Sequence, residues 1–168
     1  MLTERLELRP LGPDDVDDVY AIMSDPDVWR HRPELVHTDP ATSADWVARA
    51  AARWESDGLS YWGVRTRDSG RFIGVGGAQR QSTGNWNLHY RLAPSAWGRG
   101  YASELSVAAI EAARAVDDTV AVIAWIDPNN AASIRLAERI GLTRCGQFAD
   151  PSDGRRRLAF TDRPVQLG

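Results

Sequence analysis

The chain has 168 residues and a net charge of −3, and 43% of its residues are hydrophobic. This size fits one domain with a buried core, the charge argues against nucleic acid as a partner, and no apolar run is long enough to cross a membrane. One cysteine, Cys145, excludes an internal disulfide framework, and the N-terminus shows no secretory leader, so we expect a cytoplasmic protein.

The charge is unevenly distributed along the chain. Residues 1–60 contain more acidic than basic residues, and residues 61–168 contain more basic than acidic residues. The sequence contains no lysine, so the basic residues counted here are all arginines. The acidic part suits a cationic ligand and the basic part suits an anionic one. A solvated surface without a binding role would give the same asymmetry, so both interpretations stay open.

The first part of the chain predicts one strand and two helices. Residues 4–10 alternate polar and apolar side chains, which is typical of a strand. A helix begins near Asp14, and a second helix runs from Thr42 to about Ser56. Between them, residues 25–40 form a loop with three prolines and two histidines. Loops of this length are often binding loops. The alternative is a surface connection without a binding role, held to the core by the apolar side chains of the loop.

The rest of the chain predicts six more strands and two more helices. A turn with Asp and Gly at residues 68–70 joins two β-rich runs as a hairpin. The run 119–126 is continuously apolar, as expected for a central strand buried on both faces. The predicted strands are 60–66, 71–78, 86–92, 119–126, 142–148 and 156–160, and the predicted helices are 98–116 and 131–140.

This order of elements predicts the fold class. A helix separates strands 86–92 and 119–126, and such a crossover places the fourth and fifth strands parallel. The result is a mixed α/β (α+β) domain over residues 1–168, with a mainly antiparallel seven-stranded sheet and about four helices. Ligands of such sheets bind beyond the carboxyl ends of strands, where neighbouring strands part.

A glycine turn lies between strand 86–92 and the following helix. Gly98 and Gly100 tolerate positive φ and leave room for a ligand beside the backbone. The first N–H groups of a helix have no intrahelical partner, and the helix dipole adds positive charge there. The stretch therefore predicts a site for a phosphate group.

Two motifs in this arrangement resemble the GNAT superfamily of N-acetyltransferases over essentially the whole chain. Trp97-Gly-Arg-Gly-Tyr-Ala102 is similar to its pyrophosphate loop, with Gly100 and Ala102 at the matching positions. Trp97 stands where Gln or Arg is usual. Asn130-x-x-Ser133, followed by Arg-Ile-Gly-Leu142, is similar to the Rim-type branch, whose named members acetylate the N-termini of ribosomal proteins. Leu142 replaces the usual Phe of that pattern.

The resemblance implies acetyl-CoA as the acetyl donor. Backbone amides of the glycine turn would hold the pyrophosphate, and the edge of the fourth strand would pair with the pantetheine arm, with the start of the last helix on its other side. The coenzyme-binding residues implied in this way are Leu92, Ala93, Trp97, Gly98, Arg99, Gly100, Tyr101, Ala102, Ser103, Asn130 and Ser133.

The resemblance also implies direct attack of a neutral amine on the thioester. Many members use a Tyr of the last helix as general acid, but Ala137 stands there, and the Rim-type pattern points to Ser133 instead. Candidates for the general base are His89 on the fourth strand and Glu34 in the long loop. Glu104 is a further candidate, although it fits better as a first-turn acid of its helix. For both His89 and Ser133, a purely structural role stays open as the alternative to a catalytic one.

The acceptor is expected to be a primary amine, either a protein or peptide α-amine or a small amine. Because no strong base is evident, an amine of low pKa is favoured: an α-amine titrates at about 7.7–8.0 and a lysine amine at about 10.4. A non-catalytic CoA-binding module is the alternative. The superfamily includes many dimers, so a homodimer is one expectation. The three histidines and Cys145 have no metal-ligand spacing, and no metal is expected.

Overall fold

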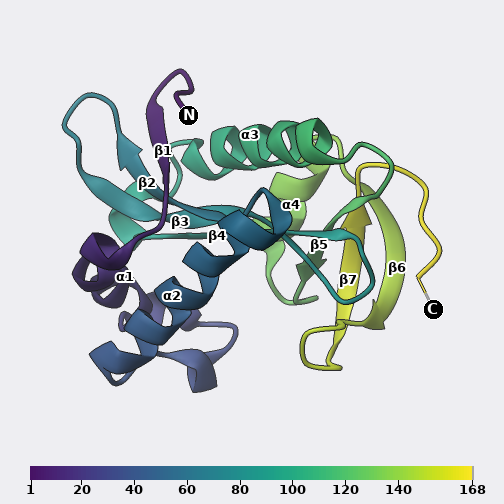
Figure 1. Cartoon of the computed structure of the whole chain (residues 1–168). Helices are drawn as coiled ribbons and strands as arrows, with labels where there is room; N and C mark the ends of the chain where they lie inside the picture. The colour runs from purple at the N-terminus through teal and green to yellow at the C-terminus, as the bar shows by residue number, and fades with distance from the viewer. Residues whose placement is uncertain (168) are drawn as a thin grey trace.

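The computed structural model describes residues 1–167 and contains the seven strands and four α-helices that the sequence predicts (Figure 1). The strands are β1 (Leu6–Pro10), β2 (Tyr61–Thr66), β3 (Phe72–Arg80), β4 (Trp86–Leu92), β5 (Val122–Ile126), β6 (Thr143–Ala149) and β7 (Arg156–Thr161). The helices are α1 (Val16–Met23), α2 (Pro40–Asp57), α3 (Tyr101–Val116) and α4 (Ala131–Arg139).

All seven strands form one sheet in the order β1-β2-β3-β4-β5-β7-β6. Every neighbouring pair is antiparallel except β4 and β5, which confirms the predicted parallel pair. These two strands pair only at Trp86–Val122 and Asn87–Ile123. Beyond that point they lose their register, so the carboxyl end of β4 has a free edge next to β5.

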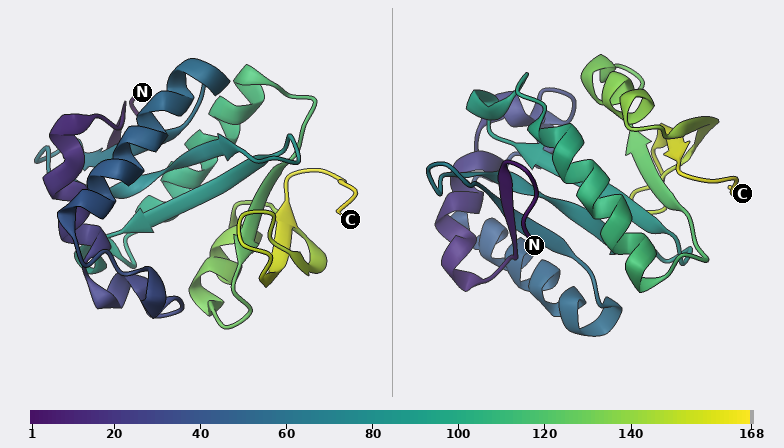
Figure 2. Two further views of the ribbon diagram at one scale, coloured as in Figure 1. Left: turned by 60° about the horizontal axis from the view of Figure 1, so that its bottom comes forward. Right: turned by 90° about the horizontal axis from the view of Figure 1, so that it is seen from above.

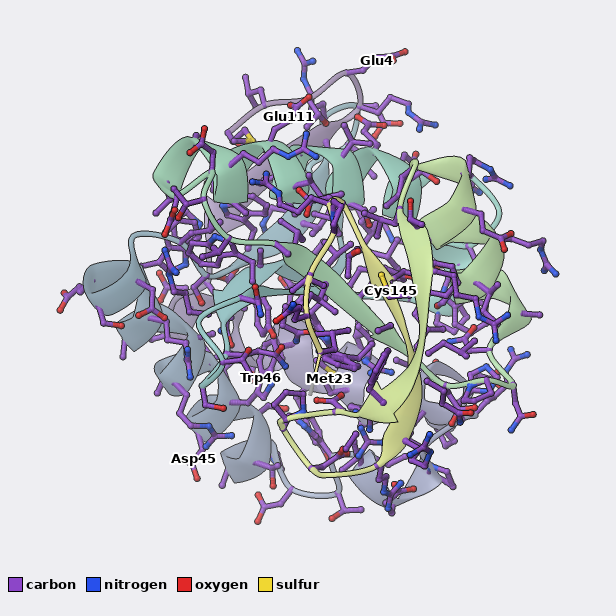
Figure 3. The ribbon with its side chains drawn as sticks, turned by 90° about the vertical axis from the view of Figure 1, so that its right-hand side faces the viewer. Glu4, Met23, Asp45, Trp46, Glu111 and Cys145 are labelled. Atoms are coloured by element: carbon purple, nitrogen blue, oxygen red, sulfur yellow. The ribbon has the colours of Figure 1, made fainter. Side chains whose placement is uncertain are left out.

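Helices cover both faces of the sheet (Figure 2). Helices α3 and α4 pack on one face over a core that contains Trp86, Leu105 and Phe160. Helices α1 and α2 pack on the other face, around Val19 and Val47. Figure 3, viewed from the β6 side, shows Met23 and Trp46 on the α1–α2 side. The sheet is therefore the middle layer of three, and a side chain's face decides which helices it meets.

Several element boundaries differ from the predictions by one to three residues, among them the starts of α3, α2 and β5. Helix α3 begins at Tyr101 instead of Gly98, because Gly98 and Gly100 both have left-handed φ, of 72° and 80°. Helix α2 begins earlier, at Pro40, since the Asp39 carboxylate accepts the Ala41 N–H at 2.8 Å and caps the helix. Strand β5 begins later, at Val122, after a turn that precedes it.

The loop at residues 25–40 is more ordered than its sequence predicts. It contains two 3-10 turns, Pro26–Trp29 and Pro33–Leu35. The Asp25 carboxylate accepts the Asp27 N–H at 2.9 Å and caps the first turn. Trp29 is buried against the core between the sheet and helices α1 and α2, and its indole N–H donates to the Met23 carbonyl at 2.7 Å. The loop thus has a fixed path along the end of β4.

Candidate active site

A cleft of about 510 Å³ opens beside the carboxyl end of β4, where β4 and β5 no longer pair. Its walls come from Tyr90–Leu92, the glycine turn before α3, the first turns of α4 and residues 27–31. Most of the residues expected to bind the coenzyme line this cleft, and only Ala93 and Arg99 do not. Those that line it are Leu92, Trp97, Gly98, Gly100, Tyr101, Ala102, Ser103, Asn130 and Ser133.

The glycine turn has the backbone conformation that an anion site needs. Gly98 and Gly100 have positive φ, and a Cβ at Gly98 would meet no atom within 4 Å, so backbone conformation alone favours glycine there. Gly100 directly precedes the first residue of α3, Tyr101. The free N–H groups of that helix therefore begin at the cleft wall.

Trp97 fastens the glycine turn to the end of β4. Its indole N–H donates to the Leu92 carbonyl at 2.8 Å, and the Arg30 guanidinium lies 5.0 Å from its ring centroid. The backbone N–H of Ala93 donates to the Ile73 carbonyl at 2.8 Å, toward β3 and away from the cleft. Along an extended strand these directions alternate, so the N–H of Leu92 points to the cleft side.

The N-terminal segment holds the same turn from outside. The Arg5 guanidinium donates to the Arg99 carbonyl at 2.7 Å and to the Glu104 carboxylate at 2.8 Å. Glu104 also accepts the Thr3 hydroxyl. Partial burial acts to raise the pKa of Glu104, but the hydrogen bonds from Thr3 and Arg5 lower it. Glu104 does not line the cleft, and its contacts match the structural role that the sequence favoured.

Ser133 and Tyr90 both line the cleft. The Asn130 carboxamide accepts the Ser133 N–H at 3.1 Å and caps α4, which fixes Ser133 in the first turn. Tyr90 lies on β4, and burial raises the pKa of its hydroxyl, while the nearby Ser133 hydroxyl and Arg91 act in the opposite direction. Ala137, one turn further along α4, is buried in the core.

Tyr90 was not singled out by sequence reasoning, which favoured His89 because of its imidazole. Strand alternation puts these neighbours on opposite faces, and that signal was available. Tyr90 packs with the core under α3, whereas His89 lies on the α1–α2 side. Which face of β4 borders the cleft depends on how β4 and β5 separate. The local sequence pattern of β4 does not contain that information.

His89 does not line the cleft. Its ring lies 4.8 Å from the Tyr61 ring and 6.2 Å from the Trp46 ring. Its Nε2 is buried without a hydrogen-bond partner among residues 1–167. Burial, together with the charge of Arg91, lowers the pKa of His89 to about 3. The imidazole is therefore neutral and a weak proton acceptor.

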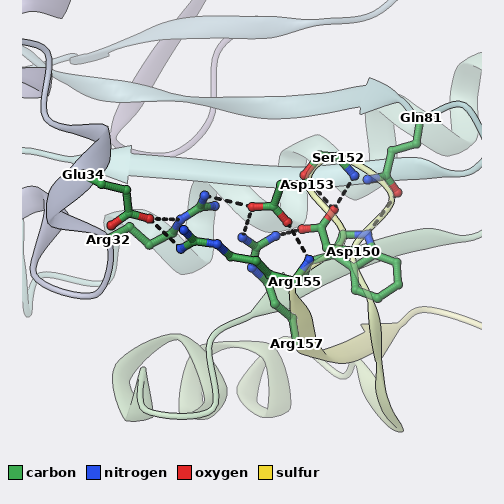
Figure 4. Close-up of polar contacts among 9 residues, drawn as sticks. Arg32, Glu34, Gln81, Asp150, Ser152, Asp153, Arg155 and Arg157 are labelled. Atoms are coloured by element: carbon green, nitrogen blue, oxygen red, sulfur yellow. Dashed lines mark hydrogen bonds and ion pairs between the residues drawn. The ribbon is translucent and has the colours of Figure 1, made fainter.

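Glu34 also lies outside the cleft, in an ion-pair network that joins the long loop to the β6–β7 hairpin (Figure 4). Its carboxylate binds Arg155 at 2.5 Å and lies 3.5 Å from the Arg32 guanidinium. A backbone hydrogen bond and these arginines lower its pKa, although burial opposes them. Arg32 in turn binds Asp153 at 2.8 Å. The network holds the loop in place, and it leaves Glu34 already paired.

Two kinds of feature are absent from the described part of the chain. No group of three or more His, Cys, Asp or Glu side chains in residues 1–167 is arranged to hold a metal ion. No helix among the same residues is long and apolar enough to span a membrane.

Comparison with known proteins identifies the family. The acetyltransferase (GNAT) domain model matches residues 5–143. The uncharacterized protein YkkB of Bacillus subtilis is 30% identical over 146 residues, which are 84% of each chain. An acetyltransferase structure from Agrobacterium tumefaciens has a TM-score of 0.82 and 26% identity, covering 98% of this chain and 94% of that one. The chain therefore belongs to the GNAT family, and its expected class, an N-acetyltransferase, is confirmed.

The Rim-type branch has weaker support. The structure of RimL, a ribosomal L7/L12 α-N-protein acetyltransferase in complex with coenzyme A, has a TM-score of 0.79 but only 16% identity, covering 96% of this chain and 95% of that one. A likeness at this identity shows the fold alone, so membership of that branch stays a prediction.

Proposed function

We propose that the protein transfers an acetyl group from acetyl-CoA to a primary amine, by direct attack within a complex of both substrates. The observation that carries the proposal is the cleft at the end of β4, which has the glycine turn and the N-terminus of α3 on one side and the capped start of α4 on the other. Acetyl-CoA in an extended conformation fits between these two helix ends, because the N-terminus of α3 can bind its negatively charged phosphates.

The residues present suit coenzyme A. The N–H groups that follow Gly100 would hold the pyrophosphate, and Arg30, Arg135 and Arg139 line the same cleft and bring positive charge to it. The backbone of Tyr90 and Leu92 would pair with the pantetheine amides as an added strand would. RimL, which shares this fold, was solved with coenzyme A.

Two hydroxyl groups are placed to assist the reaction. When the amine attacks, the thioester oxygen gains negative charge and the thiolate leaves, so a proton donor near either one stabilises the transition state. Tyr90 and Ser133 supply such donors in the cleft. The raised pKa of Tyr90 keeps its hydroxyl protonated at neutral pH. We assign Tyr90 the stronger role because its acidity exceeds that of a serine hydroxyl.

His89 and Glu34 remain candidates for the base, but neither lines the cleft. We therefore expect the acceptor to lose its proton largely to solvent, which favours amines of low pKa. Two kinds of acceptor are compatible with this expectation, a small amine of low pKa and a protein N-terminus as in the Rim-type branch. A non-catalytic CoA-binding module is the second candidate, since Ala137 stands where many members have a catalytic tyrosine.

The test measures release of the CoA thiol with a panel of amines at pH 7.4. We expect turnover with α-amines that exceeds turnover with lysine side-chain amines by about tenfold or more, since the neutral fraction differs by over two orders of magnitude. Equal rates on both would overturn the acceptor preference. Tight CoA binding without acetylation of any amine would favour the non-catalytic module.

A further inference from the structure

The cleft contains a partly buried positive charge that the coenzyme site does not use. Arg91 follows Tyr90 on β4, lines the cleft, and points to the face opposite the glycine turn, because neighbouring strand residues alternate. Its guanidinium stacks 3.7 Å from the Trp29 ring centroid, and its Nη1 donates to the Val28 carbonyl at 3.0 Å. Its Nε is buried without a partner among residues 1–167.

The contrast with Arg157 shows how unusual this is. Arg157 is also shielded from solvent, but it binds the Asp150 carboxylate and lies 2.6 Å from Asp153. No ion pair joins Arg91 to a carboxylate of residues 1–167, and the charge that acts most strongly on Arg91 is that of Arg32, which has the same sign. A buried guanidinium without a counter-charge is unfavourable, so its position calls for an anion supplied from outside the chain.

The geometry of the free edge indicates which anion fits. Since Nη1 is engaged by Val28, the Nε side of the guanidinium is the one left free. The Nε–H and Nη2–H groups of an arginine can donate side by side to the two oxygens of one carboxylate. The coenzyme pyrophosphate is expected at the start of α3, on the other face of β4. It is therefore not the anion that the Nε–Nη2 edge of Arg91 would bind.

We propose that Arg91 binds an anionic group of the acceptor, so that the enzyme acts on amines that also carry a carboxylate, such as short peptides, which keep the low amine pKa expected above, or amino acids. This inference rests on the proposed function and narrows its acceptor. The acidic N-terminal third of the chain suits a cationic ligand, but beside β4 the cleft wall contains Arg30, His31 and Arg91 with the single carboxylate of Asp27. Residues 27–31, which contain Val28 and Trp29, hold the guanidinium in place for this role.

The test compares each amino acid with its own amide, an acceptor pair that differs in the carboxylate. The variants are Arg91→Met, Arg91→Lys and the control Arg49→Gln, which removes an exposed arginine of α2 outside the cleft. We expect Arg91→Met to lower the acid-to-amide ratio of kcat/KM by about 30-fold or more, as for loss of a charged hydrogen-bonded pair. Arg91→Lys should give a smaller loss, and Arg49→Gln none.

The fraction of folded enzyme cancels within each ratio, and the difference in amine pKa between the acid and the amide cancels when the ratio is compared between wild type and variant. An aminoalkyl phosphonate distinguishes the two anion types: if it, and not the amino acid, shows the Arg91-dependent preference, the carboxylate assignment is overturned. An unchanged acid-to-amide ratio in Arg91→Met overturns the inference while the acetyltransferase proposal stands. A raised KM for acetyl-CoA together with an unchanged ratio would instead assign Arg91 to the donor.

A binding measurement decides the inference even if no amine is turned over. The CoA-loaded protein is titrated with an amino acid and with its amide in a calorimeter, and the thermal unfolding midpoint of each variant is recorded. We expect the wild type to bind the acid at least about tenfold more tightly than the amide, and Arg91→Met to lose that difference. Equal binding of the pair to the wild type contradicts the proposal.

Discussion

The indole N–H of Trp97 donates to the carbonyl oxygen of Leu92 at 2.8 Å, and so joins the glycine turn to the last residue of β4. Trp97 occupies a position where the family pattern has a polar side chain. Its ring is 41% exposed, so its burial contributes little to the core. The bond connects the strand edge and the helix N-terminus at the cleft that we propose for the coenzyme.

Removal of this one donor tests its role. Trp97→Phe keeps an aromatic ring for Arg30 but loses the hydrogen bond, which is worth about 1 kcal/mol. We expect KM for acetyl-CoA to rise about fivefold, with kcat nearly unchanged, because the glycine turn is no longer held in a fixed position against the end of β4. Steady-state kinetics with varied acetyl-CoA measure both. An unchanged KM would show that the turn holds its position without Trp97.

The two glycines of the turn give a second prediction. An alanine at Gly98 or Gly100 must adopt left-handed φ, which costs about 1–2 kcal/mol. At Gly100 the added Cβ would also approach Arg5 Nη2 to 3.3 Å. We expect both variants to raise KM for acetyl-CoA, by about tenfold, with the larger effect at Gly100.

Gly70 provides the matched control, since its φ is 69° and a Cβ there meets nothing within 4 Å. It lies in the β2–β3 turn, outside the cleft. Gly70→Ala should lower the thermal unfolding midpoint about as much as Gly98→Ala and leave KM for acetyl-CoA unchanged. A similar KM for Gly70→Ala and Gly98→Ala would mean that the turn conformation has no specific role in binding.

The two hydroxyl groups of the cleft give a third prediction. We expect Tyr90→Phe to lower kcat by about tenfold or more, and Ser133→Ala by less, since general acids typically contribute two or more orders of magnitude but a thiolate leaves without much help. KM for acetyl-CoA should change little in Tyr90→Phe. The readout that separates chemistry from packing is the pH profile.

In the wild type, kcat should not fall at alkaline pH until Tyr90 ionises, and its raised pKa places that loss above about pH 10. In Tyr90→Phe no such loss remains. If Tyr90→Phe retains wild-type kcat and the same alkaline limb, the hydroxyl has no part in the reaction and Ser133 becomes the leading donor.

The fold and the position of the glycine turn could be predicted from the sequence because both depend on local pattern. Strand 86–92 matches β4 to the residue, and the glycine turn lies where the strands part. The acceptor side could not be predicted in this way. Glu34 pairs with Arg155 across 121 positions of sequence, and the loss of pairing between β4 and β5, not alternation, decides that Tyr90 and Arg91 reach the cleft while His89 does not.

The buried imidazole of His89 gives a prediction about stability. In the unfolded chain a histidine titrates near 6.5, whereas burial and Arg91 lower the pKa of His89 to about 3 in the folded protein. Between these values the unfolded state holds more protons than the folded state, so the free energy of unfolding is largest above about pH 6.5 and falls as the pH drops. The slope from one such group is at most about 1.4 kcal/mol per pH unit.

The variant that isolates this contribution is His89→Phe, which keeps an aromatic ring against Tyr61 and Trp46 and removes the unpartnered Nε2. We expect its free energy of unfolding, from urea titration, to fall less than that of the wild type between pH 7.5 and pH 5. The pKa of His37 is also lowered by burial, so part of the slope should remain in the variant. Identical slopes in the two proteins would mean that His89 can take up a proton in the folded state, and this result would strengthen it as a candidate base.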